Sequence, residues 1–174
     1  MTAATLTLDT LNRVSREEFE QALGAVFEHS PWIAGRAGEA RPFASVEALH
    51  AGMIAVVRRA SRQEQLALLR AHPDLAGRAA RAGALSDASS AEQSSAGLDR
   101  LSDEEYERFG RLNAAYREKF GFPFIIAVRR HDKTGILDTF QTRLRNTPDQ
   151  EVETALAEVA AITRLRLARL VKER

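Results

Sequence analysis

The stretch SDEEYERFGRLNAAYREKFGFPFIIAV, residues 102–128, decides the fold class. Ser102 and Glu105 have the spacing of a capping box, which marks the start of a helix. Apolar side chains then recur at helical spacing, and they are Tyr106, Phe109, Leu112, Tyr116 and Phe120. Gly121 is typical of the residue that ends a helix, because glycine adopts the left-handed backbone there at little cost. The pattern predicts one long helix between Ser102 and Gly121.

The apolar run FPFIIAV, residues 122–128, follows that helix directly. Its composition would suit a β-strand, but the chain contains no second strong strand that could pair with it. A lone strand cannot satisfy its own backbone hydrogen-bonding groups. We therefore expect an all-α protein in which this run is a short, buried, extended connector through the core.

Capping residues and capping boxes predict five further helix starts. These starts follow Ser15, Ser45, Ser61, Thr134 and Thr147. The helix after Ser15 is expected to continue to about Glu28, and the helix after Ser61 to end near His72. Residues 77–95, rich in Ala, Ser and Gly, predict a surface excursion with short helical pieces. The whole pattern favours a single-domain, compact helical bundle over residues 1–174.

Composition narrows the function classes. The chain has 174 residues, 25 Lys and Arg against 24 Asp and Glu, and no cysteine. Disulfides, thiolate nucleophiles and cysteine-ligated metals are therefore excluded. The formal net charge of +1 gives no reason to expect nucleic acid or an anionic membrane as a partner. Without a secretory signal or a membrane-length apolar run, a cytoplasmic location is expected.

His72 is the first candidate for chemistry. The four histidines, His29, His50, His72 and His131, show no metal-ligand spacing, so no metal site is expected. Pro73 disfavours helical backbone at His72, which places this imidazole at a helix C-terminus, where the helix dipole favours its protonated form. His72 can then act as an acid or a base. The alternative is that it only caps the helix end.

Glu92, Arg129 and Trp32 are further candidates. Glu92 stands three residues after Ser89, so it is expected in the first turn of a short helix, either for proton transfer or as part of a capping box. Arg129 ends the apolar run, and its guanidinium matches a carboxylate, although a surface role is the alternative and Arg130 follows it. Trp32 belongs either to the core or to a lid over a ligand.

Five segments together resemble a known family. They are FEHSPWIAGRA at 27–37, HPDLAG at 72–77, SSAEQSSAGL at 89–98, LNAAYREKFGFPFIIAVR at 112–129 and RLRN at 143–146. In order and spacing they resemble the 2-oxo-4-hydroxy-4-carboxy-5-ureidoimidazoline (OHCU) decarboxylases. The resemblance implies an all-α, commonly dimeric enzyme without a cofactor. It also implies the last of three steps from urate to allantoin, after uricase and 5-hydroxyisourate hydrolase.

The resemblance also implies roles for individual residues. It makes His72, Glu92 and Arg129 the catalytic residues, with Ser89 and Gln93 as partner positions in substrate binding. The remaining pocket positions that it implies are Pro73, Phe122, Phe124, Ile125 and Ile126. His72 would shuttle a proton, while Glu92 would hold the ureido nitrogens, orient His72 or accept a hydroxyl proton. A non-catalytic helical interaction module and a decarboxylase of a related ureide are the competing interpretations.

Overall fold

The computed structural model describes residues 5–174, and most of them are helical. Contacts between residues divide the chain into two compact units. Unit 1 contains the residues up to Leu68 together with Thr163–Arg174, and unit 2 contains Leu69–Ile162. The all-α prediction is confirmed, whereas the single-domain assignment over residues 1–174 stays a prediction, and residues 1–4 lie outside the described part.

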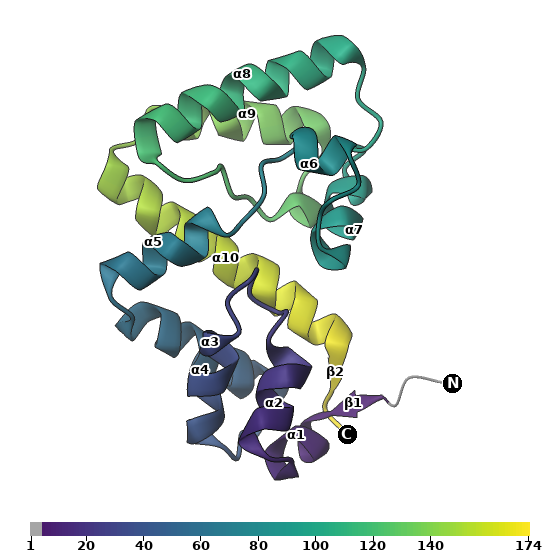
Figure 1. Ribbon diagram of the computed structural model, residues 1–174, viewed down its shortest axis with the longest axis vertical. Helices are drawn as coiled ribbons and strands as arrows, with labels where there is room; N and C mark the ends of the chain where they lie inside the picture. Colours follow the sequence, from purple (N-terminus) through teal and green to yellow (C-terminus); the bar gives the residue numbers. More distant parts are fainter. Residues whose placement is uncertain (1–4) are drawn as a thin grey trace. The chain divides into compact units, whose positions relative to one another are not determined.

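Unit 1 holds the N-terminal helices and both short strands (Figure 1). Its elements are β1 (Leu6–Thr7), α1 (Leu8–Arg13), α2 (Arg16–Leu23), α3 (Trp32–Ala37), η1 (Gly38–Ala40), α4 (Val46–Arg59), most of α5 (Arg62–Arg70), the end of α10 (Pro148–Leu170) and β2 (Val171–Lys172). The two strands pair in parallel, with Leu6 opposite Val171.

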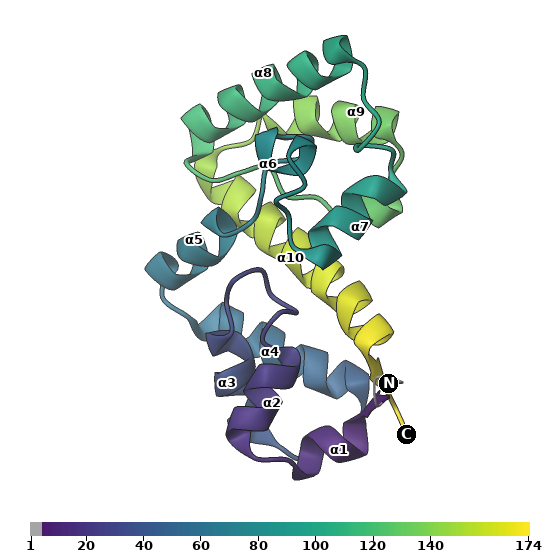
Figure 2. The ribbon, with the colours of Figure 1, turned by 45° about the vertical axis from the view of Figure 1, so that its right-hand side comes forward.

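Unit 2 holds the helices of the second half of the chain. Its elements are α6 (Arg78–Arg81), α7 (Asp87–Ser95), α8 (Asp103–Phe120), η2 (Val128–Arg130), α9 (Lys133–Arg143) and most of α10. Figure 1 and Figure 2 both show α8 and α9 side by side. Tyr116 of α8 packs its ring edge against Phe140 of α9, and Phe124 stacks on Phe140 at a centroid distance of 3.9 Å. Among residues 5–174, no helix combines the length and apolar character needed to cross a bilayer.

The predicted helix starts after Ser15, Ser45, Ser61, Ser102 and Thr147 are confirmed, because in each case that side chain accepts a backbone N–H of the first turn. The start assigned to Thr134 is wrong. Asp132 caps α9 instead, since its carboxylate accepts the N–H of Gly135 at 2.7 Å. Aspartate and threonine are both good N-cap residues, so the sequence alone did not distinguish Asp132 from the nearby Thr134.

The helix after Ser15 ends at Leu23, earlier than the predicted Glu28. Gly24 weakens the helix there, and the chain continues as turns in which Ser30 donates to the Phe27 and Glu28 carbonyls. The side chain of Glu28 is buried and accepts from Arg166 at 2.9 Å. The apolar spacing predicted too long a helix, because Val26 and Phe27 are buried although they lie in these turns.

The connector at 122–128 is confirmed as buried and non-helical up to Ala127, and all seven of its residues are buried. Its backbone is satisfied by side chains rather than by a strand. Arg143 donates to the Ile125 carbonyl at 2.6 Å, and Glu158 accepts the N–H of Ala127 at 3.1 Å. These partners come from α9 and α10, which explains how an isolated extended segment is tolerated in the core.

Candidate active site

His72 lies just after α5, which ends at Arg70, and it begins the loop of residues 72–77. Its backbone N–H donates to the Leu69 carbonyl at 3.3 Å, and the residue is only 7% exposed. The predicted place at a helix C-terminus is confirmed. This places His72 at the negative end of the α5 dipole.

The 72–77 loop is tied to its neighbours at three consecutive residues. Gln93 of α7 accepts the N–H of Ala76 at 2.9 Å and donates to the Asp74 carbonyl at 3.3 Å. The Asn113 amide of α8 donates to the Leu75 carbonyl at 2.9 Å. Ala76 has φ +51°, a left-handed conformation that costs energy for any residue with a Cβ. The loop is therefore held in a shape that its own backbone does not prefer.

Helix α7 carries Ser89, Glu92 and Gln93, but it starts earlier than predicted. Ser86 is its N-cap and accepts the N–H of Ser89 at 3.2 Å. The capping-box interpretation of Ser89 and Glu92 is therefore wrong: Ser89 lies inside the first turn and Glu92 one turn further on. Ser89 and Gln93 are buried, and the side chain of Gln93 is engaged with the 72–77 loop.

Arg129 lies in η2, the single turn that ends the connector, and η2 packs against α7. Arg129 is half-buried, whereas Arg130 is exposed. Arg129, the more buried of the two arginines, is therefore the better candidate for contact with a ligand. Helix α7 thus carries Glu92, bonds to the loop of His72 and contacts the turn of Arg129, so the structure brings the segments of all three predicted residues to one helix (Figure 2).

A buried polar network, which the sequence did not reveal, is bonded to the connector through Arg143. The Glu151 carboxylate, with none of its surface exposed, accepts from Arg143 at 2.6 Å, from the Tyr116 hydroxyl at 2.7 Å and from Asn146 at 2.9 Å. The guanidinium of Arg143 also lies 4.3 Å from the centre of the Phe124 ring. Burial, together with the bond to Glu151, raises the pKa of Tyr116 well above its ordinary value. The motif RLRN at 143–146 thus supplies two of the network's members.

The remaining pocket positions are less directly supported. Phe122, Phe124, Ile125 and Ile126 are all buried core residues. Pro73 is half-buried beside His72. Their role in binding stays a prediction.

Trp32 belongs to unit 1, where it begins α3 and Arg36 stacks 4.6 Å from the centre of its ring. No group of three or more His, Asp or Glu side chains within residues 5–174 is arranged to hold a metal ion.

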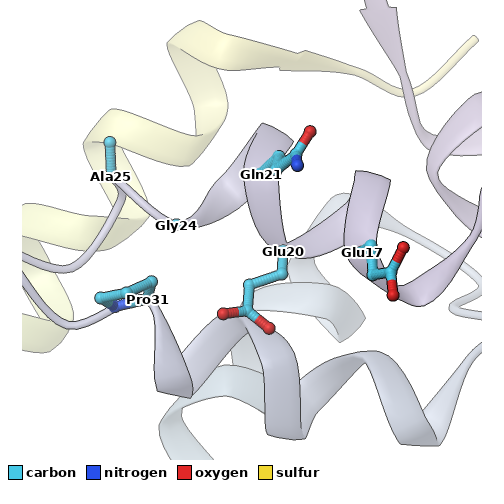
Figure 3. A pocket seen from close by; sticks show the side chains of 6 residues that line it. All are labelled: Glu17, Glu20, Gln21, Gly24, Ala25 and Pro31. Atoms are coloured by element: carbon cyan, nitrogen blue, oxygen red, sulfur yellow. The ribbon is translucent and has the colours of Figure 1, made fainter.

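Unit 1 contains two surface hollows that are formed by residues outside the predicted site. One of about 380 Å³ is lined by Glu17, Glu20, Gln21, Gly24, Ala25 and Pro31. Figure 3 shows its two glutamates projecting from α2. A second hollow, of about 260 Å³, lies where α4, α10 and β2 meet, and it includes His50 and Leu167. No residue predicted to be catalytic lines either hollow.

Comparison with known proteins decides the family. The family model described as OHCU decarboxylase matches residues 12–168. This chain belongs to the OHCU decarboxylase family. A 2-oxo-4-hydroxy-4-carboxy-5-ureidoimidazoline decarboxylase of Haloferax volcanii is 48% identical over 163 residues, which cover 94% of this chain and 95% of that protein.

Two longer proteins contain a region that is similar to this chain. The uric acid degradation bifunctional protein PucL of Bacillus subtilis is 40% identical over 168 residues, covering 97% of this chain and 33% of PucL. The crystal structure of (S)-allantoin synthase superposes with a TM-score of 0.77 at 33% identity, covering 96% of this chain and 54% of that one. This chain therefore spans about half of the synthase chain and a third of PucL.

Proposed function

We propose that this chain decarboxylates 2-oxo-4-hydroxy-4-carboxy-5-ureidoimidazoline to (S)-allantoin, the last step from urate to allantoin, with His72, Glu92 and Arg129 as its catalytic residues. One observation carries the assignment of residues. In a member of the OHCU decarboxylase family, the segments of these three residues meet at α7.

The reaction defines what the site must do. The bond between the ring carbon and the carboxylate breaks, CO2 leaves, and the electron pair stays on the ring carbon. The conjugated imine and neighbouring carbonyl groups spread this charge, so the reaction as proposed needs no cofactor. The electron pair moves into the imine and forms an enol between the ring carbon that lost CO2 and the neighbouring carbon that carries the ureido group. The enol hydroxyl then gives up its proton and becomes the carbonyl of allantoin. A proton must reach one face of the ureido-bearing carbon, because unguided protonation by water would give both enantiomers.

Each proposed residue has a role that suits its place. His72, buried after the C-terminus of α5, delivers the proton to the ureido-bearing carbon. Glu92, half-buried on α7, holds the ureido nitrogens or orients the imidazole. Arg129 binds the polar edge of the substrate with its planar guanidinium.

The buried Ser89 and the half-buried Pro73, with the backbone of residues 122–126, would complete the pocket. Gln93, which the resemblance placed in substrate binding, supports the site chiefly through the 72–77 loop, because its amide already bonds to that loop at both ends.

We further propose that the enzyme is a cytoplasmic homodimer, coupled in function to uricase and 5-hydroxyisourate hydrolase. The name of PucL, a bifunctional protein of uric acid degradation, supports this coupling, since that protein contains a region similar to this chain. Size-exclusion chromatography with light scattering tests the dimer: a mass of one chain, 19.2 kDa, would refute it.

The assay generates the substrate in situ from urate with uricase and the hydrolase. Adding this protein should accelerate the ultraviolet decay of the intermediate and give one enantiomer of allantoin. His72→Asn should fold and lose the acceleration, whereas His29→Asn, at a largely exposed histidine of unit 1, should retain it. Unchanged decay with racemic product would refute the decarboxylase assignment, and full activity in His72→Asn would remove that residue from the mechanism.

A further inference from the structure

One face of α8 carries three polar residues for which the proposed mechanism has no use. Asn113, Tyr116 and Arg117 are three and four positions apart, so their side chains leave the helix on the same side. All three belong to the segment LNAAYREKF that follows Gly110 and Arg111 in this long helix. Each makes a contact with a segment of the candidate site, and the contacts go to two different segments.

Asn113 and Arg117 hold the loop of His72. Asn113 donates to the Leu75 carbonyl at 2.9 Å, and Arg117 donates to the Asp74 carboxylate at 2.9 Å. The two contacts differ in their surroundings, since Asn113 is buried and the Arg117–Asp74 pair is partly exposed. Buried bonds of this kind constrain geometry more firmly than exposed ion pairs, so Asn113 is the principal anchor on α8.

The other half of the Asn113 amide supports a specific role. Its Oδ1 is buried and has no hydrogen-bond partner within the described residues 5–174. An unpaired buried acceptor is unfavourable, and a leucine of similar size would avoid it. The asparagine is therefore not explained by core stability. Its contribution is the hydrogen bond from its Nδ2 to the Leu75 carbonyl in the loop.

Tyr116 reaches the second segment through the buried network. Its hydroxyl donates to Glu151, which also binds Arg143, and Arg143 donates to the Ile125 carbonyl. Ile125 belongs to the connector that leads directly to Arg129. One turn of α8 is therefore bonded to the loop that begins with His72 and, through two side chains, to the connector that leads to Arg129.

We propose that Asn113 and Tyr116 are positioning residues, which fix the loop of His72 and the connector of Arg129 to one rigid helix and so set the geometry between proton carrier and substrate-binding arginine. The inference rests on the proposed function. Asn113 governs the proton-transfer step through His72, whereas Tyr116 governs substrate binding through Arg129. Residues that orient the ligands of a metal site typically change activity by about 10- to 100-fold when they are substituted. We expect an effect of similar size from residues that orient His72 and Arg129.

The test compares Asn113→Leu and Tyr116→Phe in the coupled urate assay. Asn113→Leu should lower kcat by about 10- to 100-fold with little change in KM, because the loop is released. It should also lower the enantiomeric excess of allantoin at saturating enzyme, since a displaced imidazole no longer protonates one face. Tyr116→Phe should raise KM several-fold and leave kcat within about twofold.

Phe109→Leu is the matched control, because Phe109 is fully buried one turn earlier on α8 and has no polar group that could bond to the loop or to the connector. It should lower the melting temperature while leaving kcat, KM and enantiomeric excess of the folded protein unchanged. If Asn113→Leu does not fold, Asn113→Ala removes the same bond with a helix-forming residue.

Wild-type kcat and enantiomeric excess in a folded Asn113 variant would overturn the proposal, as would equal changes in the Phe109 control. An inactive wild-type protein would instead refute the proposed function, so the two failures are distinguishable.

Discussion

Arg143→Met tests whether a buried ion pair supports the connector. In the native chain the side chains of Arg143 and Glu151 are 6% and 0% exposed and lie 2.6 Å apart. Methionine keeps much of the aliphatic volume, so the substitution removes the charge and its bonds rather than opening a large cavity. Glu151 would keep its bonds from Tyr116 and Asn146, but its buried charge would lose its cationic partner.

The magnitude follows from what is left unpaired. Removing one partner of a buried ion pair costs about 3–5 kcal/mol, because the remaining charge stays in a poorly solvated site. The Ile125 carbonyl loses its donor as well, and the contact with the Phe124 ring is lost. Because of these additional losses, we expect Arg143→Met to reduce the free energy of unfolding by about 4 kcal/mol, above the lower end of that range.

Urea unfolding measures this loss. Both tyrosines of the chain, Tyr106 and Tyr116, lie in unit 2, so near-ultraviolet circular dichroism of tyrosine follows that unit. With a urea dependence of about 2 kcal/mol per molar, the midpoint should fall by about 2 M. Fluorescence of Trp32, the single tryptophan, follows unit 1 in the same titration.

Arg81→Met is the matched control. Arg81 also pairs with a carboxylate, Asp103 at 2.7 Å, and also lies over a ring, Tyr106 at 4.0 Å, but this pair is largely exposed. Its loss should cost less than about 1 kcal/mol. Adding Glu151→Gln to Arg143→Met should restore part of the stability, since no buried charge remains. Equal midpoints for Arg143→Met and Arg81→Met would refute the reasoning.

Three smaller perturbations test other parts of unit 2. The raised pKa of Tyr116 means that its contribution to stability is complete below about pH 10 and is lost as the pH rises beyond that value; the urea midpoint should therefore fall more steeply between pH 9 and 11 in wild type than in Tyr116→Phe. Ser102→Ala removes the cap of α8 and should cost about 1 kcal/mol in the same titration at pH 7. Gly121→Ala should cost about 1 kcal/mol for backbone reasons alone, because φ is +76° and the added Cβ would meet only Arg70, at 3.9 Å.

Each of these predictions has a contrary outcome. Identical alkaline slopes would show that Tyr116 does not stay protonated in the folded chain. A Ser102→Ala midpoint equal to that of wild type would mean that the capping bond does not stabilise α8. Stabilisation by Gly121→Ala would contradict the left-handed conformation of the helix end.

Much of the fold was predictable because its signals are local. The capping boxes at Ser15, Ser61 and Ser102 form between a side chain and a backbone group three residues away, so their spacing in the sequence is enough to reveal them. Gly121 ends α8 for the same local reason. The apolar character of residues 122–128 likewise predicted their burial correctly.

The site was predictable only in part. His72 could be placed at a helix end because proline restricts the residue before it. The start of α7 could not, because both Ser86 and Ser89 are good caps and only the structure selects between them. That choice moved Glu92 from the first turn of α7 into its second.

The sequence by itself determined where α2, α4, α5, α8 and α10 begin, which run is buried and which residues resemble a family's catalytic set. Only the tertiary structure decided that Gln93 and Asn113 hold the 72–77 loop and that Arg143 completes the backbone of the connector. These bonds join residues 17, 38 and 18 positions apart. No local spacing encodes such pairs, because they form only when packed helices bring distant polar groups together in a core where each must find a partner.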